Sequence, residues 1–224
     1  MLKVVVFDTG YGGEFFADQL AEELPVVEII RVINWRDAKK ITTNRKNAHK
    51  IVEESLRPYL NKVDLIIFAN YYLTITSLKY FQRKYKKQRF LGLKLKQPDS
   101  FIRRDTLVLS VSPVSSTLHF HHFLLRLNRK TKVLNMDSWP EKIDDGELSS
   151  EEINQELKLF LYKNKGYSPK EVILASAQFN DIKTDLKKVL GQGLNIYDGF
   201  SMLSRETIKA LNLRGKTWKI HKKV

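Results

Sequence analysis

The stretch VVVFDTGYGG, residues 4–13, places an acid, a hydroxyl and three glycines directly after a short apolar run. Asp8 offers a carboxyl group, Thr9 a hydroxyl, and Gly10 a main-chain N–H near the start of the next helix. Parallel sheets bind ligands at the carboxyl ends of their strands, and helix N-termini attract anions, so this turn suits a small anionic ligand. It lacks both the Lys-Ser/Thr ending of a P-loop and the dinucleotide-binding spacing of glycines.

A second stretch, VILASAQFND at residues 172–181, also runs from a predicted strand into a loop. Ser176 is the side chain there that could attack a substrate, but a serine hydroxyl needs a neighbouring base, usually His or Lys. The loop offers Gln178 instead. The stretch therefore reads as an active-site loop without an evident base.

Short apolar runs alternate with longer amphipathic ones, which predicts βα units and parallel sheets. The predicted strands are 3–7, 27–32, 64–69, 89–93, 105–111, 131–135, 171–175 and 194–197. The predicted helices are 14–24, 42–60, 73–87, 115–128, 149–165, 180–190 and 200–212. The helix at 149–165 has a serine N-cap and an acidic first turn, and Gly166 is expected as its C-cap. A long polar loop is expected at 137–150, and a crossover between two halves at 93–106.

Four stretches together resemble the glutamate racemases. VFDTGYGG at 6–13 is similar to their Asp-Ser-Gly-x-Gly-Gly opening, and DLIIFANYYLTITSL at 64–78 to their strand ending in Ala-Cys-Asn-Thr-Ala-Ser. EVILASAQFNDI at 171–182 is similar to their Leu-Gly-Cys-Thr-His-Tyr-Pro, and NIYDGFSMLSRETIKAL at 195–211 to the strand and final helix that follow. The order and spacing fit over nearly the whole chain, which therefore resembles the aspartate/glutamate racemase superfamily.

The resemblance implies an α/β fold of two similar lobes, each a mostly parallel sheet flanked by helices, facing each other across a cleft. We expect residues 1–97 and 199–224 to form the first lobe, and residues 98–198 the second. The family needs no cofactor, and its racemases often pair, so no cofactor and a possible homodimer are expected here.

The resemblance also shows where this sequence departs from the family. The first family cysteine falls on Asn70, and the Asn and Thr that follow it fall on Tyr71 and Tyr72. The second cysteine falls on Ser176, the following Thr on Ala177 and the His on Gln178. Of the residues that move protons in that family, Asp8 alone is kept.

Racemisation without a cofactor needs a base on one face of the Cα atom and an acid on the other, and the family uses two thiols. A free thiol has a pKa of about 8.5, so a thiolate is accessible near neutral pH. This chain has no cysteine, and an amide such as Asn70 has no comparable basic form. We therefore expect the two-thiol reaction to be lost. The alternative is that the chain is an enzyme of another kind. It would be an isomerase that uses Asp8 with other partners, or it would catalyse a lyase or hydrolase reaction at Ser176.

Ligand binding is the function that such a site could retain. Ser115, Ser116 and Thr117 lie at the start of the predicted helix 115–128, where they would either cap it or hold a carboxylate or phosphate. Tyr71 and Tyr72 would narrow the site or provide a stacking surface. The expected ligand-binding residues are Thr9, Gly10, Tyr71, Tyr72, Thr74, Ser115, Ser116, Thr117 and Ala177.

The histidines of LHFHHFLLRL do not predict a metal site. His119 and His122 share a helix face, but a metal site needs a third ligand. No other His, Asp or Glu has a sequence spacing that would identify it as this ligand. Phe120, Phe123 and Leu124 are expected to form the core face, with the histidines at its margin.

The net charge of +14 attracts polyanions. Basic clusters interleaved with aromatic residues lie at 36–50, 79–89 and 214–223, and they make nucleic-acid or other polyanion binding a third hypothesis. The longest apolar runs are far shorter than the ~20 residues that span a bilayer. We expect a cytoplasmic protein that does not enter the membrane.

Overall fold

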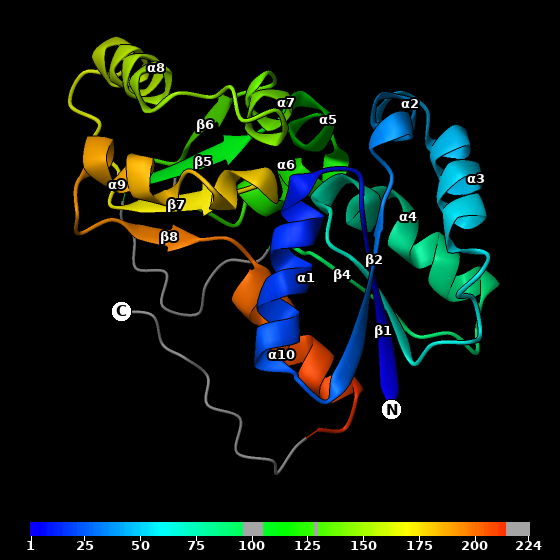
Figure 1. Cartoon of the computed structure of the whole chain (residues 1–224). Helices are drawn as coiled ribbons and strands as arrows, with labels where there is room; N and C mark the ends of the chain where they lie inside the picture. The colour runs from blue at the N-terminus through cyan, green and yellow to red at the C-terminus, as the bar shows by residue number, and fades with distance from the viewer. Residues whose placement is uncertain (96–104, 128–129, 214–224) are drawn as a thin grey trace. The chain divides into compact units, whose positions relative to one another are not determined.

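The structure is a computed structural model that describes residues 1–95, 105–127 and 130–213 (Figure 1). The chain forms two compact units, one made of Met1–Lys94 with Phe200–Val224 and the other of Leu95–Gly199. Each unit contains a four-stranded parallel sheet flanked by helices. The predicted fold class of two parallel α/β lobes is confirmed. The predicted lobe boundary between residues 97 and 98 lies outside the described residues.

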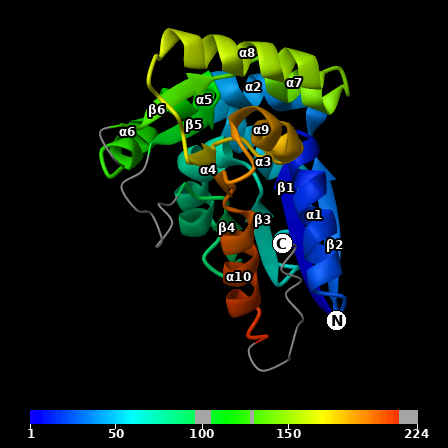
Figure 2. The ribbon, with the colours of Figure 1, turned by 90° about the vertical axis from the view of Figure 1, so that its left-hand side faces the viewer.

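The sheet of the first unit has the strand order β2-β1-β3-β4, which Figure 2 shows from one side. Its strands are β1 (Leu2–Asp8), β2 (Val27–Ile33), β3 (Leu65–Phe68) and β4 (Phe90–Gly92). Its helices are α1 (Tyr11–Glu23), α2 (Ala38–Thr43), α3 (Arg45–Leu56), α4 (Tyr71–Lys84) and α10 (Phe200–Ala210), with a 3₁₀ turn, η1, at Trp35–Asp37.

Both faces of this sheet are buried, which explains why its central strands are continuous apolar runs. Val5 and Phe7 pack with Ile66 and Phe68 against residues of α2, α3 and α4. Side chains alternate along a strand, so Val4 and Val6 point to the other face, and they are also fully buried. Helices α1 and α10 lie on one side of the sheet (Figure 2), where Phe16 and Phe200 contact each other with ring centroids 4.9 Å apart.

The second unit repeats this topology with the strand order β6-β5-β7-β8. Its strands are β5 (Thr106–Ser110), β6 (Lys132–Asn135), β7 (Glu171–Leu174) and β8 (Asn195–Tyr197). Its helices are α5 (Ser112–Ser115), α6 (Leu118–Leu124), α7 (Trp139–Asp144), α8 (Ser150–Lys163) and α9 (Lys183–Leu190), with a 3₁₀ turn, η2, at Gln178–Asn180. All eight predicted strands are present in the two units.

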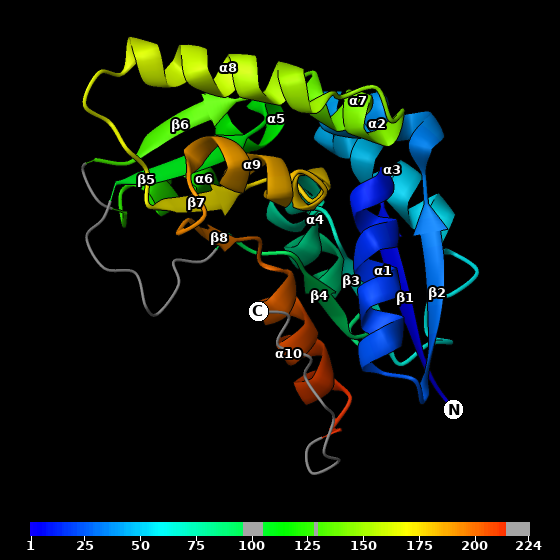
Figure 3. The ribbon, with the colours of Figure 1, turned by 60° about the vertical axis from the view of Figure 1, so that its left-hand side comes forward.

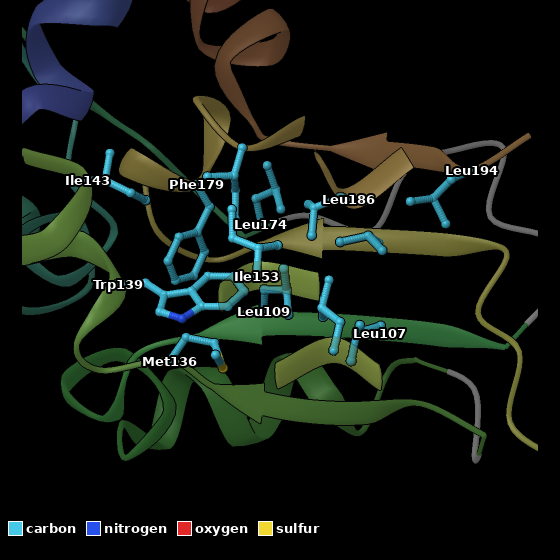
Figure 4. Close-up of a cluster of buried hydrophobic side chains, with 13 residues drawn as sticks. Leu107, Leu109, Met136, Trp139, Ile143, Ile153, Leu174, Phe179, Leu186 and Leu194 are labelled. Carbon is cyan, nitrogen blue, oxygen red and sulfur yellow. The ribbon is translucent and has the colours of Figure 1, made fainter. Parts of the chain in front are cut away.

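The prediction of a long polar loop at 137–150 is wrong. Helix α7 begins there, with Pro140 in its first turn. Proline is tolerated at this position because the N–H groups of the first turn have no acceptor within the helix. Trp139 is fully buried, and its ring meets that of Phe179 edge-on with centroids 6.1 Å apart. Figure 4 shows Trp139 and Ile143 in one apolar cluster with Leu109 and Leu174. The helix was not predicted because polar residues surround its two buried side chains in the sequence.

Two predicted helices are each divided by a capping residue. The helix expected at 42–60 is α2 followed by α3, because Asn44 is extended and its side chain accepts hydrogen bonds from the N–H groups of Lys46 and Asn47. The helix expected at 115–128 is α5 followed by α6, because Thr117 caps α6 by accepting from the N–H of Phe120. Residue 128 lies outside the described residues.

Helix α8, which runs along the second unit in Figure 3, confirms one predicted cap and corrects the other. The Ser149 hydroxyl accepts a hydrogen bond from the N–H of Glu152, as expected of the N-cap. The C-cap is Asn164 and not Gly166; its side chain donates to the carbonyl of Phe160 at 2.8 Å. Gly166 follows in the left-handed conformation with φ of 79°.

Candidate functional site

Asp8 and Asn70 meet at the point where the strand order of the first sheet reverses. From β1 the chain passes through α1 to β2 on one side, whereas β3 pairs with the other side of β1. Parallel α/β sheets bind ligands at the carboxyl ends of two such strands. Asp8 ends β1, and Asn70 follows β3 directly after Ala69, whose N–H donates to the carbonyl of Phe7 at 3.0 Å. The fold thus brings together two residues that the sequence singled out.

Asn70 holds the side chain of Asp8. Its Nδ2 donates to Asp8 Oδ1 at 2.8 Å and to Thr9 Oγ1 at 3.2 Å. The N–H of Thr9 also donates to Asp8 Oδ1, at 2.6 Å. Asp8 is fully buried, and these contacts fix its carboxyl group against the strand end.

The same amide of Asn70 is the N-cap of α4. Its Oδ1 accepts a hydrogen bond from the N–H of Leu73 at 3.0 Å. Asparagine is among the best N-cap residues because its side-chain oxygen replaces the missing helical acceptor. Both ends of the Asn70 amide are therefore used in hydrogen bonds within the protein.

Two glycines make room for this arrangement. A Cβ atom on Gly13 would lie 2.2 Å from the Cβ of Asp8, so a side chain at residue 13 would displace Asp8. A Cβ atom on Gly92 would lie 2.4 Å from Oγ1 of Thr74, a buried residue in the first turn of α4. The GYGG motif thus serves the packing of Asp8 as well as the turn.

Tyr71 and Tyr72 lie in the first turn of α4 and are mostly covered. Tyr71 is only 3% exposed, and the half-buried Tyr72 packs against the core between the sheet and α2, α3 and α4. Thr9 and Gly10 are buried next to Asp8, and Gly10 is the N-cap of α1 without a side-chain cap. Of these residues, Thr9 and Gly10 lie where a ligand at the strand ends would meet main-chain and hydroxyl groups.

Ser176 in the second unit is bound to Gln178. The Ser176 hydroxyl donates to Gln178 Oε1 at 2.8 Å, and Ser176 is 8% exposed. An amide oxygen accepts a hydrogen bond but does not take up a proton near neutral pH, so Gln178 does not activate the hydroxyl. The pair occupies the carboxyl end of β7, beside Ala177.

Asn180, which the sequence analysis did not single out, lies in the same loop. Its Nδ2 donates to the carbonyl of Ala177 at 2.8 Å. Its Oδ1 is buried and has no hydrogen-bond partner among the described residues. Buried acceptors without a donor are uncommon in native proteins, so this oxygen is a place where a ligand or water donor fits.

The hydroxyls of Ser115, Ser116 and Thr117 make local contacts. They donate to the carbonyls of Ser112, Pro113 and Val114 at 3.5, 3.4 and 2.7 Å respectively. Ser112 differs from them, because its N–H and hydroxyl both donate to Asp137, at 2.5 and 2.6 Å. The three hydroxyls thus complete the turns between α5 and α6.

Two exposed aromatic residues, Trp35 and Tyr11, lie near the carboxyl end of the first sheet and were not singled out from the sequence. Asn34, whose N–H donates to the carbonyl of Asp8 at 2.9 Å, caps the 3₁₀ turn that starts with Trp35. Trp35 is 44% exposed and Tyr11, at the start of α1, is 39% exposed. Trp35 lies two residues after the end of β2, and this position next to a strand end could have been recognised in the sequence.

The histidines of α6 are exposed, Phe120 and Phe123 are buried, and Leu124 is only half-buried. Among the residues that the structure describes, no three His, Asp or Glu side chains gather as metal ligands would. No helix in the described part of the chain is both long and apolar enough to span a membrane.

The chain is similar in sequence and fold to known racemases. No family model matches the chain. A glutamate racemase of Clostridium novyi (strain NT) is 23% identical over 229 residues, covering 96% of this chain and 88% of that protein. The structure of Escherichia coli glutamate racemase, in complex with L-glutamate and the activator UDP-MurNAc-Ala, superposes with a TM-score of 0.81 at 18% identity over 94% of this chain and 82% of that one. Aspartate racemase of Picrophilus torridus gives a TM-score of 0.60 at 14% identity over 94% of each chain.

This chain therefore has the fold of the aspartate/glutamate racemase superfamily, and the resemblance inferred from the sequence is confirmed. It contains no cysteine. Asn70 and Ser176 occupy the positions that the resemblance assigns to the two thiols.

Proposed function

We propose that this chain is a racemase-like protein that has lost two-thiol racemisation and binds a small carboxylate, or another small anion, at the carboxyl ends of its strands. The observation that carries the proposal is the hydrogen bond from Asn70 to Asp8. At a position where the family has a thiol that moves protons, this chain has an amide that holds a carboxyl group in place.

The chemistry of the second unit supports the same conclusion. Proton transfer at Cα needs two groups that can change protonation state near neutral pH. Ser176 is not such a group, because its hydroxyl is directed at the Gln178 amide oxygen. Neither residue 70 nor residue 176 can therefore replace a thiol in inversion.

The proposed anion site is at the start of α1. Gly10 caps this 13-residue helix without a side chain, so main-chain N–H groups of its first turn are not covered by a capping side chain. Anions bind at helix N-termini because these N–H groups and the helix dipole attract negative charge. The adjoining Thr9 would contact the ligand, and the buried Asp8 carboxyl, which accepts from the N–H of Thr9, would hold Thr9 in position.

Thermal denaturation with L- and D-glutamate, L- and D-aspartate and inorganic phosphate tests the proposal. A ligand at a hundred times its Kd should raise the free energy of unfolding by about 2.7 kcal/mol. Chiral chromatography of the recovered amino acid should show unchanged handedness. Thr9→Val should reduce the stabilisation, whereas the matched control Thr43→Val, on the exposed part of α2, should not.

Two results would contradict the proposal. If none of these ligands shifts the unfolding transition, the site does not bind small carboxylates or phosphate. If the recovered amino acid contains the opposite enantiomer, the chain is an isomerase that works without thiols.

A further inference from the structure

Cations gather at the amino-terminal end of the first sheet, away from the strand ends that hold Asp8 and Asn70. The sequence has no Asp or Glu between Asp64 and Asp99, but it has many Lys and Arg residues there. The loop after α3 leads into β3 and the loop after α4 leads into β4, and these strands are parallel neighbours. Both loops therefore lie at the same end of the sheet as the N-terminus of the chain (Figure 1).

Gln88 joins the two loops. Its Oε1 accepts a hydrogen bond from the N–H of Asn61 at 2.9 Å. Its Nε2 donates to the carbonyls of Val63 and Arg89, at 3.1 and 3.2 Å. Gln88 is only 6% exposed, so this connection is part of the folded core and holds the two loops in one arrangement.

Some of the cations here have structural partners. Lys84 pairs with Glu53 at 2.6 Å, and the guanidinium of Arg89 donates to the carbonyl of Ala210 in α10. Five other exposed cations at this end form what we call the amino-edge patch. Its members are Arg57, Lys62, Arg83, Lys86 and Lys87.

Internal contacts do not account for the three lysines of this patch. Lys62, Lys86 and Lys87 form no ion pair with any carboxylate in the described part of the chain. Cations favour helix C-termini, but the effect is confined to the last turn. These three lysines follow the ends of α3 and α4, so the helix dipoles do not explain why they are gathered together.

We infer that the amino-edge patch binds the phosphate backbone of nucleic acid without reading the bases. Several cations spread over two fixed loops match a ligand with repeated negative charges, and phosphate contacts give affinity without sequence preference. The neighbouring aromatic rings are not placed for stacking on bases. The Tyr85 hydroxyl donates to Glu53 at 2.5 Å and its ring stacks on Phe81, while Tyr59 packs against the core.

This inference is independent of the proposed carboxylate site, because the two lie at opposite ends of the same strands. Changes in the patch should leave ligand-induced stabilisation by amino acids as it is in the wild type. Failure of either proposal can therefore be recognised separately.

Fluorescence anisotropy of a labelled single-stranded oligonucleotide, titrated with the full chain at several salt concentrations, tests the inference. Lys86→Gln with Lys87→Gln should lower the slope of log affinity against log salt by about 1.4, since each lost contact to a single strand contributes about 0.7. Affinity at low salt should fall on the order of tenfold, equally for oligonucleotides of different base composition.

The matched control is Lys158→Gln with Lys163→Gln, which removes two exposed lysines from α8 in the second unit. It changes the net charge by the same amount and should retain nearly the wild-type affinity and slope. Gln88→Ala leaves the charge unchanged but removes the connection between the loops, so it should weaken binding while the chain remains folded by circular dichroism.

Three outcomes would overturn the inference. Equal losses in the two lysine pairs would mean that the total charge, and not the patch, attracts the oligonucleotide. Affinity that depends on base composition would contradict recognition of the backbone alone. Tighter binding to phosphatidylserine vesicles than to the oligonucleotide, lost with Lys86 and Lys87, would assign the patch to a membrane surface.

Discussion

The side-chain amide of Asn70 joins the Asp8 carboxyl, 2.8 Å from its Nδ2, to the first turn of α4, where its Oδ1 accepts from the N–H of Leu73. The two residues are 62 positions apart in sequence and meet at the switch point of a parallel sheet. One side chain thus has a capping function and a positioning function at the place where the family resemblance puts a thiol.

Replacement of Asn70 by Ala should be more destabilising than loss of an ordinary helix cap. Removing an N-cap costs about 1 kcal/mol, and removing a donor from a buried carboxyl group adds about 1–3 kcal/mol. Urea denaturation of Asn70→Ala should therefore show a loss of about 2–4 kcal/mol. The matched control is Asn44→Ala, because Asn44 caps α3 on the exposed surface and should lose about 1 kcal/mol. Equal losses in the two variants would show that the contact with Asp8 contributes nothing.

Gly13 is required because Asp8 occupies the space beside it. The Cβ atom of Gly13→Ala would lie 2.2 Å from the Cβ of Asp8, so the carboxyl group must shift. Overpacking of this kind typically costs about 1–3 kcal/mol. Gly193→Ala is the control, since no atom lies within 4 Å of its added Cβ. Thermal denaturation should separate the variants, and a Gly13→Ala protein as stable as wild type would mean that Asp8 is not held as described.

Trp139 anchors α7 to the sheet of the second unit. Its side chain is fully buried, and truncation of a buried Trp to Ala costs about 3–5 kcal/mol. Trp35→Ala is the control, because Trp35 is 44% exposed and substitutions at the surface usually change stability by less than about 0.5 kcal/mol. Chemical denaturation followed by circular dichroism measures both. A small effect of Trp139→Ala would show that residues 139–144 do not belong to the core.

The pair of Glu53 and Lys84 should make stability depend on pH. The hydrogen bond from Lys84, and then that from Tyr85, lowers the pKa of the Glu53 carboxyl group. A carboxyl group with a lowered folded-state pKa contributes stability above its unfolded pKa of about 4.3, and this contribution is lost as the pH falls through the folded-state value.

The measurement is the free energy of unfolding of wild type and Glu53→Gln from pH 7 to pH 3. The difference between them should be largest near pH 7 and should shrink below about pH 4.3. Glu54→Gln, which changes an exposed neighbour on α3, should follow the wild-type profile. A difference that stays constant over this range would show that the ionised form of Glu53 is not the stabilising one.

The strands and most helices could be predicted because each strand is a short apolar run bounded by polar or glycine-rich turns. Helix α7 was not predicted because this six-residue helix has only two buried side chains, Trp139 and Ile143, which are too few to show a helical pattern. The break between α2 and α3 at Asn44 was not predicted, because an asparagine inside an amphipathic stretch can be either a surface residue of one helix or the cap of a new one.

The residues of the candidate site could be identified from sequence, but their contacts could not. The position of Asn70 came from the family resemblance, whereas its bond to Asp8 depends on strands that are distant in sequence. Ser176 and Gln178 were seen as a hydroxyl without a base, and the structure adds that they bond to each other. The buried side-chain oxygen of Asn180 could not be predicted from the sequence, because its environment is created by tertiary packing.

Proton exchange at Cα tests most directly whether this chain has lost racemisation. Each enantiomer of glutamate and aspartate is incubated with the purified protein in heavy water, and the Cα signal is followed by proton NMR, with an active glutamate racemase as the positive control. Since Asn70, Ser176 and Gln178 offer no group that can remove the proton, the signal should keep its intensity. Incorporation of deuterium at Cα, abolished by Asp8→Asn, would show that the chain retains proton-transfer chemistry without thiols.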